Sequence, residues 1–420
     1  MIDKGKNRGT APLFNNRNVI TISLIFFVLG VTAFVFQLAG HHPELAWQAY
    51  LINFLLWSAV AQGGVLFSAV MHLVKARWTG PLSGLSESFA GFFPVSFLMF
   101  LLLYLGNTHV FPWQYQDLHG KEVWLNLWFL FSRDGAGLLI LYGLGFVYLN
   151  YSLKLRFAGN SGNTEKATKG MIRRLFIAQW SQSKQDPEQI KKRMTVFSAL
   201  YIAAFALILS LIGYDLVMSA DPHWVSTLFG AYTFVKAFYV GLGALIILAA
   251  SFYIRHGDSF GLTPARFHDL GKLYFAFCLL WADFFYVQFL VIWYGNIPEE
   301  TSYIIIRTMT SPWNNLAWTV FILCFIIPFF VLLNKKIKTK PWFMIVLCSL
   351  AIVGMWLEHL LLLGPALNQH VTAIPLGLTD GLIFIGFLGS MMLSVTFFLN
   401  LFPELIVPAR TQLAQSKEVK

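Results

Sequence analysis

Ten apolar stretches divide this chain into long hydrophobic segments joined by shorter polar connections. A helix that crosses a bilayer needs about 20 mostly apolar residues, and each stretch has about that length or more. Little sequence is left over for a soluble domain, so the stretches predict an all-α polytopic membrane protein. The predicted segments are Val19 to Leu38, Trp47 to Leu73, Phe89 to Val110, Leu125 to Tyr151, Thr195 to Met218, Val225 to Ile254, Leu270 to Tyr294, Trp313 to Leu333, Trp342 to Leu363 and Leu378 to Leu401.

The basic residues indicate how these segments are oriented. Nearly all of the 30 Lys and Arg residues lie in the amino terminus, in every second connection and in the tail. The remaining connections hold only Lys121 and Arg307. Because Lys and Arg concentrate on the cytoplasmic side of membrane proteins, both termini are expected in the cytoplasm. The same asymmetry explains the net charge of +10, so the basic balance does not indicate a nucleic-acid partner.

This orientation divides the chain into one membrane domain and its cytoplasmic extensions. The longest connection is rich in Lys and Arg and also contains Gly, Pro and polar residues, which predicts a solvated loop with a short amphipathic helix at the lipid surface. The expected parts are the cytoplasmic amino terminus 1–18, the ten-helix membrane domain 19–402 with its long loop 154–193, and the cytoplasmic tail 403–420.

Several kinds of chemistry are disfavoured by what the chain lacks. Cys278, Cys324 and Cys348 stand singly inside apolar segments, so the chain alone is expected to hold neither an iron–sulfur cluster nor a metal ion. The lysine-containing phosphate loop of ATP-driven pumps is also missing. His72 and His359 are the histidines clearly inside segments, and the orientation puts them in opposite leaflets, which disfavours a haem held between two histidines.

Ionisable residues inside the membrane segments are costly and usually serve a function. Arg133 and Asp134 are neighbours in the fourth segment, so their side chains point about 100° apart and each needs a partner on another helix. Asp215, Glu358 and His359 are expected in the same outer half of the membrane, as is Asp380 at the start of the last segment. These groups form either a structural network of buried pairs or a functional polar site.

Two further charges lie deeper in the predicted membrane domain. Lys236 is about 16 Å from the outer end of the sixth segment at the usual helical rise, and Asp283 is near the middle of the seventh. Since these segments form an antiparallel hairpin, we expect the two side chains to meet, either as part of a proton relay or as a static ion pair. The candidate proton path comprises His72, Asp215, Lys236, Asp283, Glu358 and His359.

Three stretches of the chain resemble a known family. They are Asp215 to Gly230, the pair His268 to Lys272 and Gln288 to Glu300, and Gly354 to His359. They resemble the integral membrane subunits of bacterial alternative complex III, which belong to the polysulfide reductase membrane-subunit (NrfD-like) family. The similarity covers essentially the whole chain.

The resemblance implies a fold and a setting. Helices two to five and six to nine are expected to form two four-helix bundles, with the first and tenth helices at the side. The chain is expected in the bacterial cytoplasmic membrane, in a complex with a sister NrfD-like subunit and with iron–sulfur and cytochrome c subunits. Such a complex oxidises quinol and passes electrons, through clusters and c-type haems on the partner subunits, to a cytochrome c or directly to a terminal oxidase.

The resemblance also implies a candidate quinol pocket. In the sister subunit, a histidine and an aspartate from helices two to five form this pocket near the periplasmic face. Asp134 matches the aspartate by helix and depth, Arg133 lies beside it, and His109 and His119 are the candidates for the histidine. The resemblance further implies that this chain binds no cofactor covalently, and that quinone or quinol and structural lipids are its expected ligands.

Two functions remain open at this point. In the first, the chain is a subunit of a quinol-oxidising respiratory complex and contributes contacts, a quinone site or a proton path. In the second, it is a stand-alone secondary transporter whose buried Asp, Glu and Lys residues couple ion movement to substrate movement. The scarcity of paired Pro or Gly breaks within the segments and the short outer turns, such as Ser219 to Trp224, favour the first.

Overall fold

The computed structural model describes residues 17–118, 120–158, 186–368 and 373–406. Within these ranges the chain is helical and contains no strand. Ten helical segments are long and apolar enough to cross a membrane, which confirms the predicted all-α, multi-pass membrane fold. Most of the predicted amino terminus, most of the long loop, His119 and most of the tail lie outside the described residues.

The spans follow one another along the chain with short helices in some connections. The first five are α1 (Arg17–Leu38), α2 (Pro43–Leu73), a third span made of α3 (Pro81–Glu87), η1 (Ser88–Phe92), α4 (Phe93–Leu103) and α5 (Asn107–Val110), then α6 (Leu127–Ala158) and α8 (Pro187–Leu216). The second five are α9 (Phe229–His256), α10 (Pro264–Gly295), an eighth span made of α12 (Trp313–Phe321), η7 (Ile322–Ile326) and α13 (Ile327–Leu333), then α15 (Pro341–Leu367) and α16 (Leu378–Leu401). The connecting helices are α11 (Pro298–Thr308) and α14 (Lys335–Lys338).

Proline marks the start of several spans. A proline at the first helical position fixes the backbone angle φ and lacks an N–H group that would have no partner there. Four of these helices begin one or two turns before the apolar stretches do, so hydropathy alone predicts their starts too late, whereas the helix at Pro341 begins one residue before its predicted start. The prolines at the starts are Pro43, Pro81, Pro187, Pro264 and Pro341.

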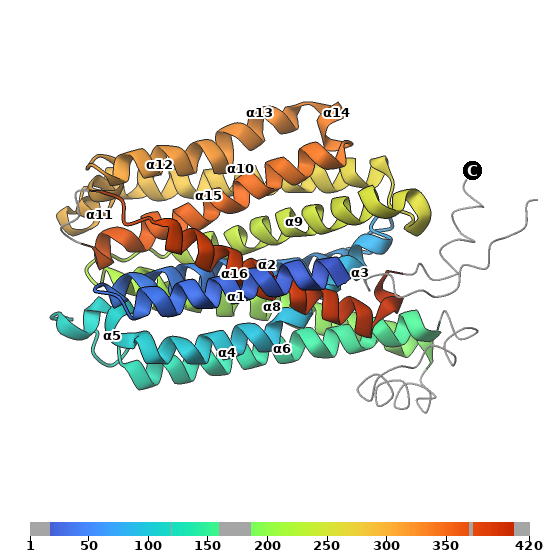
Figure 1. The fold of residues 1–420 in the computed structure, drawn as a ribbon, viewed down its shortest axis with the longest axis horizontal. Helices are drawn as coiled ribbons and strands as arrows, with labels where there is room; N and C mark the ends of the chain where they lie inside the picture. Colours follow the sequence, from blue (N-terminus) through green and yellow to red (C-terminus); the bar gives the residue numbers. More distant parts are fainter. Residues whose placement is uncertain (1–16, 119, 159–185, 369–372, 407–420) are drawn as a thin grey trace, which may run out of the picture.

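The spans run side by side along the long axis of the molecule (Figure 1). α2 is the most deeply buried span, and it packs against α4, α8, α9, α15 and α16. On one side of α2, α4 packs against α6, and α6 packs against α8. On the other side, α9 packs against α10 and α15, and both of these helices pack against the eighth span. α1 packs chiefly against α16. The grouping into two four-helix bundles stays a prediction. The candidate functional site described below lies where α2 and α8 meet α9.

Two helix crossings depend on glycine. At the crossing of α2 and α9, a Cβ atom on Gly63 would lie 2.1 Å from the carbonyl oxygen of Ala237, and one on Gly241 would lie 2.3 Å from the carbonyl carbon of Gly63. At the crossing of α1 and α16, a Cβ atom on Gly30 would lie 2.3 Å from Cα of Gly386. Such backbone contact is typical of membrane helices, in which small residues let helices approach closely.

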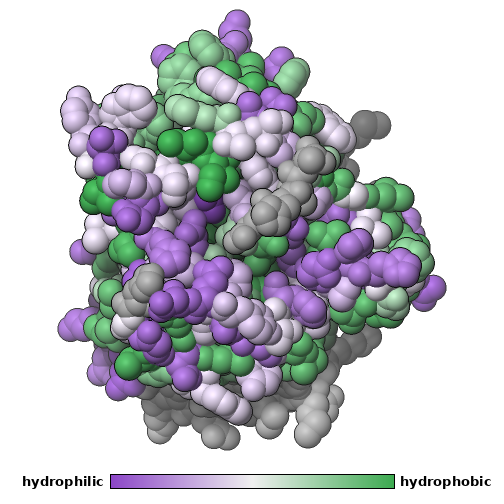
Figure 2. Space-filling view, turned by 90° about the vertical axis from the view of Figure 1, so that its left-hand side faces the viewer, coloured by the Kyte–Doolittle hydropathy of each residue, from purple (hydrophilic) through white to green (hydrophobic). Residues whose placement is uncertain are grey.

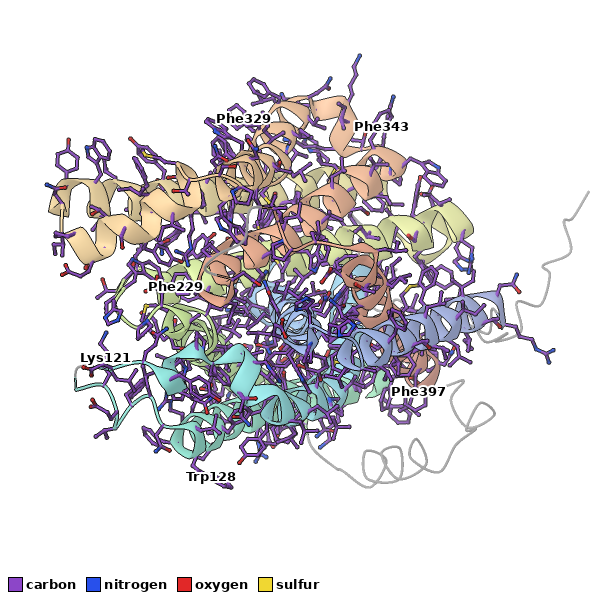
Figure 3. All side chains as sticks on the ribbon, turned by 60° about the vertical axis from the view of Figure 1, so that its left-hand side comes forward. Lys121, Trp128, Phe229, Phe329, Phe343 and Phe397 are labelled. Atoms are coloured by element: carbon purple, nitrogen blue, oxygen red, sulfur yellow. The ribbon has the colours of Figure 1, made fainter. Side chains whose placement is uncertain are left out.

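The two ends of the bundle differ in composition. α3 and the lysine-rich α14 lie at the right-hand end in Figure 1, which we call the basic end. α5 and α11 lie at the other end, which we call the opposite end. Figure 2 looks onto the opposite end, where hydrophilic residues cross the middle of the face between hydrophobic patches. Around the sides, large apolar residues such as Trp128, Phe343 and Phe397 point outward (Figure 3) and are 74%, 55% and 62% exposed, as the exterior of a membrane protein requires.

Candidate functional site

The first group of buried polar side chains joins α9 to α15. The ammonium Nζ of Lys236 lies 3.1 Å from Oε2 of Glu358, and the two side chains are 4% and 0% exposed. The other carboxylate oxygen of Glu358 accepts a hydrogen bond from the indole N–H of Trp281 in α10 at 3.4 Å. In the next residue, His359, ring Nδ1 lies 2.8 Å from the carbonyl oxygen of Met355. The structure therefore brings together three of the residues predicted for a proton path.

Asp283 does not belong to this group, and the predicted contact between Lys236 and Asp283 is wrong. Asp283 is exposed on the outside of α10, whereas the buried side of that helix carries Tyr274, Cys278 and Trp281. Because successive helical residues are about 100° apart, Asp283 lies about 200° around the helix from Trp281. The prediction used only the positions of Lys236 and Asp283 along their helices, which are at similar depths in the membrane. Position along a helix does not say in which direction a side chain points.

A small internal cavity lies beside the Lys236 group. Its volume is about 30 Å³, and side chains from α2, α6, α8, α9 and α15 line it. The polar part of the lining consists of Ser58, Gln62, Thr233, Lys236 and His359. A water molecule needs roughly 10–15 Å³ of such volume and several polar partners, so the cavity has room for about two water molecules.

On the α2 side of the cavity, neutral polar side chains form a hydrogen-bonded group. The amide nitrogen of Gln62 donates to the hydroxyl of Ser58 at 2.8 Å and to the hydroxyl of Tyr142 in α6 at 3.1 Å. The Tyr142 hydroxyl also lies 2.8 Å from Oγ of Ser96 in α4. The amide oxygen of Gln62 is buried and has no hydrogen-bond partner among the described residues. This group therefore has spare acceptor capacity close to the cavity.

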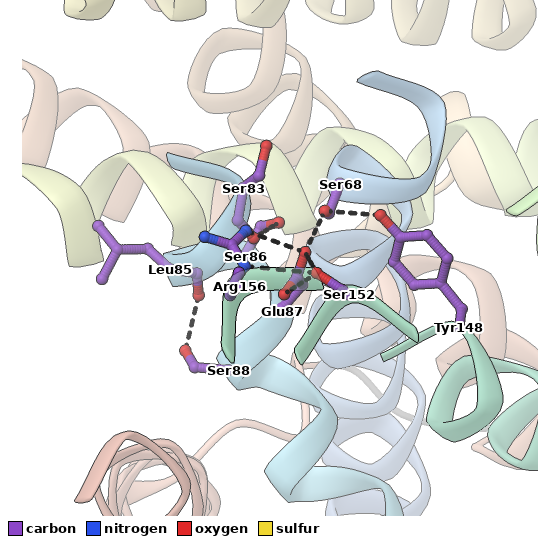
Figure 4. Close-up of polar contacts among 9 residues, drawn as sticks. All are labelled: Ser68, Ser83, Leu85, Ser86, Glu87, Ser88, Tyr148, Ser152 and Arg156. Atoms are coloured by element: carbon purple, nitrogen blue, oxygen red, sulfur yellow. Dashed lines mark hydrogen bonds and ion pairs between the residues drawn. The ribbon is translucent and has the colours of Figure 1, made fainter. Parts of the chain in front are cut away.

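A second ionisable group lies toward the basic end, around Glu87 (Figure 4). Glu87 is fully buried, and its carboxylate accepts hydrogen bonds from Ser68 at 2.7 Å and from Ser152 at 2.8 and 2.9 Å. The guanidinium of Arg156, which is 20% exposed, lies 3.3 Å from the same carboxylate. Tyr148 extends the group, because its hydroxyl lies 2.9 Å from Oγ of Ser68. Glu87 is thus a buried carboxylate linked to the surface of the basic end.

Hydropathy does not predict this group, because Glu87 comes just before the apolar stretch that begins at Phe89. The useful signal is Pro81, which starts the helix that carries Glu87 into the protein. Of the residues predicted for a proton path, His72 lies nearby: its ring is 6.4 Å from the ring of Tyr148, and its Nε2 is 3.1 Å from the hydroxyl of Thr195.

A third ionisable group lies toward the opposite end, between α6 and α8. Arg133 donates from Nε to Oδ2 of Asp215 at 2.6 Å, and the indole N–H of Trp124 donates to the other oxygen of Asp215 at 2.9 Å. The guanidinium also lies over the Trp124 ring, 4.0 Å from its centre. Arg133 therefore has its charge partner on another helix, as predicted from its position beside Asp134.

Asp134 faces Asp215 and lies in this same group. Its side chain is fully buried, its carboxyl group is close enough to that of Asp215 to interact with it, and neither Asp134 oxygen has a hydrogen-bond donor among the described residues. A proton shared between the two carboxyl groups would supply the missing donor. His109 does not meet Asp134 and instead lies near Glu44 at the start of α2. The described residues therefore do not assemble the predicted histidine–aspartate pair.

The turns at the opposite end are held together by aromatic and charged contacts. The rings of Trp224 and Tyr303 stack at 3.7 Å, and Arg307 lies 4.0 Å from Asp221 and donates to the carbonyl of Leu362. Burial raises the pKa of Tyr303 to about 12 and lowers the pKa of Arg307. Beside these turns, residues 113–114, 116–118, 122 and 125–127 line an open hollow of about 380 Å³. Lys121 at this end (Figure 3) donates to the carbonyl of Pro222.

The fold and these groups define a multi-pass membrane protein, and the described part of its interior carries three clusters of ionisable side chains and a cavity with room for about two water molecules. No protein-family model matches the chain, and no curated protein sequence matches it.

Proposed function

We propose that this chain is an integral membrane subunit of a bacterial respiratory quinol:electron-acceptor oxidoreductase of the alternative complex III type, and that it transfers protons across part of the membrane. The resemblance of three stretches to NrfD-like membrane subunits supports the setting. The length near 420 residues, the ten spans and the short basic amino terminus favour the F-type membrane subunit over its C-type sister. Partner subunits would carry the iron–sulfur clusters and haem c, and electrons would leave through a cytochrome c or a terminal oxidase.

One observation carries the proton-transfer part of the proposal, namely the order of the polar groups along α2. Ser58 and Gln62 border the cavity, and Ser68 and His72 follow toward the basic end. From Ser58 to His72 the helix rises about 21 Å, which is most of the ~30 Å hydrocarbon thickness. α6 runs beside these groups and carries Tyr142, Tyr148 and Ser152. Ser58 and Gln62 each lie within hydrogen-bond distance of the Tyr142 hydroxyl, and Ser68 lies within that distance of the Tyr148 hydroxyl.

The chemical types in this series suit proton transfer. Hydroxyl groups both donate and accept hydrogen bonds, and the Gln62 amide does so through separate atoms. Glu87, paired with Arg156, at one end, and Lys236 and Glu358 at the other, are carboxylate and ammonium groups, which can take up and release protons; the Arg156 guanidinium stays charged. The interval between Gln62 and Ser68 is about 9 Å along α2. Tyr201 donates its hydroxyl to the carbonyl of Gln62 beside this interval.

The quinol reaction fits this chain less well than proton transfer. The Asp134 carboxyl group interacts with Asp215 and Arg133, which form an ion pair with each other. His109 does not reach Asp134 and lies near Glu44 instead. We therefore assign quinol oxidation to the sister subunit and leave Asp134, Arg133 and Asp215 as the polar group nearest the opposite end, which the proposal places on the periplasmic side.

A stand-alone transporter is the alternative, and the small volume of the cavity supports the respiratory subunit over it. A site for an organic substrate needs roughly 300–1,000 Å³. The cavity beside Lys236 measures about 30 Å³, so it admits water and protons but no metabolite. The hollow of about 380 Å³ at the opposite end is open and lies outside the ionisable core.

Two measurements test the proposal. The first is affinity purification of the tagged chain from its native membrane, followed by a reduced-minus-oxidised spectrum; we expect c-type haem to copurify. The second is proton release per electron in vesicles that contain the purified complex, compared between the natural chain and Glu358→Gln. We expect a lower ratio in the variant, with a substitution at the exposed Glu188 as the matched control. Solute transport by the purified chain alone, without haem, would refute the respiratory assignment.

A further inference from the structure

α10 exposes a continuous stripe of side chains along one face. The stripe consists of Ala276, Leu279, Leu280, Asp283 and Tyr286 at the spacing of one helix face. Leu279 and Leu280 are each 40% exposed and Tyr286 is 59% exposed. Asp283 is therefore the one charged residue in an otherwise apolar or aromatic surface.

The position of Asp283 along α10 places it within the hydrocarbon region. It lies about 18 Å along the helix from Gly295, where α10 ends, and the helix continues for more than 25 Å in the other direction. Its side chain is too short to reach a membrane interface from there. Within the described part of the chain, Asp283 makes no hydrogen bond and no ion pair. Charged side chains at such depths otherwise face a protein interior, a charge partner or water, because lipid does not solvate them.

We infer that the stripe on α10 is covered by a transmembrane helix of a different protein, which presents a Lys or Arg side chain to Asp283. A cationic partner would stabilise the Asp283 carboxylate at this depth, and the flanking Leu279 and Leu280 offer the apolar contact that a helix needs. The inference rests on the proposed function only in that both place the chain in a hetero-oligomeric membrane complex.

A second copy of this chain does not fit the stripe. A symmetric contact would place Asp283 opposite Asp283, and like charges repel. The two cations deep inside the described spans, Arg133 and Lys236, are also engaged, because Arg133 pairs with Asp215 and Lys236 pairs with Glu358. A different membrane protein with a basic residue in its span satisfies the charge without disturbing these pairs.

Site-specific photocrosslinking of the full-length chain in its native membrane tests the inference. A benzophenone amino acid replaces Leu280 in the stripe or, as the matched control, Leu139 on the outside of α6. Leu139 is 56% exposed and lies about 18 Å from the start of α6, so it samples a similar depth. From Leu280 we expect an adduct with a transmembrane peptide that contains Lys or Arg within one helical turn of the crosslink. From Leu139 we expect lipid adducts.

Charge substitutions then test the pairing itself. Asp283→Lys should lower the yield of the Leu280 adduct at least tenfold, and replacing the basic residue of the identified peptide by Asp in the same cells should restore it. Asp283→Asn should give an intermediate yield. Because Asp283 is exposed, the substituted chains should keep the natural melting temperature, which shows that a lost adduct is not a folding defect.

Several results would overturn the inference: adducts from Leu280 only with lipid, adducts with another copy of this chain, a crosslinked span without a basic residue, or an unchanged yield with Asp283→Lys. Haem c in the purified material is scored separately. Haem c without the adduct rejects this interface and leaves the proposed function in place, whereas the adduct without haem c rejects the respiratory assignment and leaves the interface in place.

Discussion

The ion pair between Lys236 and Glu358 gives the most informative prediction, because its two charges can be removed singly or together. At a separation of 3.1 Å, Coulomb's law with an effective dielectric constant of ~20 gives an attraction of about 5 kcal/mol. The cost of burying both charges offsets much of that attraction. Removing one partner leaves the other charge buried and unpaired, which typically destabilises a protein by about 3–5 kcal/mol.

We therefore expect Lys236→Met and Glu358→Gln each to lower the free energy of unfolding by about 3–5 kcal/mol. The double variant Lys236→Met/Glu358→Gln leaves no unpaired charge, so it should be more stable than either single variant and close to the natural chain. The measurement is a denaturant titration of the purified chain in mixed micelles, followed by tryptophan fluorescence. Single variants as stable as the natural chain would refute the pairing.

The same four proteins separate a structural pair from a proton-transfer pair. If the pair only locks α9 to α15, the double variant should recover both stability and proton release per electron. On our proposal, it should recover stability while proton release stays as low as in Glu358→Gln, because neither Met nor Gln exchanges a proton. A double variant with natural proton release would refute the proton-transfer role and leave the pair as a helix lock.

Three further outcomes are expected from the structure. Gly241→Ala should destabilise the chain by about 1–3 kcal/mol, because its Cβ would meet the α2 backbone, whereas Gly243→Ala, whose Cβ would be 3.4 Å from its nearest neighbour, should have little effect in the same titration. Glu87→Gln should keep the serine hydrogen bonds but lose the charge pairing with Arg156, costing about 1–3 kcal/mol and lowering proton release. Tyr303 has its pKa raised to about 12, so the unfolded chain loses this proton above about pH 10 while the folded chain keeps it. The contribution of Tyr303 to the free energy of unfolding is therefore complete below pH 10, and it declines by about 2–3 kcal/mol in all as the pH rises to 12. The decline should be smaller in Tyr303→Phe, and equal declines in the two proteins would contradict the burial of this phenol.

The spans could be predicted because the signal for each is local. An apolar stretch of sufficient length has to cross the membrane whatever its neighbours are, so the ten spans needed no information on packing. The need of Arg133 for a partner on another helix was predictable for the same reason, since it follows from the angle between adjacent residues. Both predictions depend only on short segments of sequence.

The side-chain contacts and the cavity of the candidate site could not be predicted in the same way. The partner of Lys236 depends on how α9 is rotated against α10 and α15, and two charges at similar depth gave the wrong pair. The group around Glu87 depends on α3 continuing into η1, which carries a polar segment into the core ahead of the apolar stretch. The cavity is lined by five helices, so no single segment contains a sign of it.

The distribution of charge along α2 favours proton transfer over a purely structural network. The middle of this series contains neutral hydroxyl and amide groups, and the charged groups stand at its two ends. Neutral groups that both donate and accept can pass a proton along and reset, while carboxylate and ammonium groups at the ends bind it or release it. The room for water beside Lys236 connects the last neutral group to the second charged one. A lock between α9 and α15 would be more stable if that space were filled, so retaining it is consistent with a chain that moves protons.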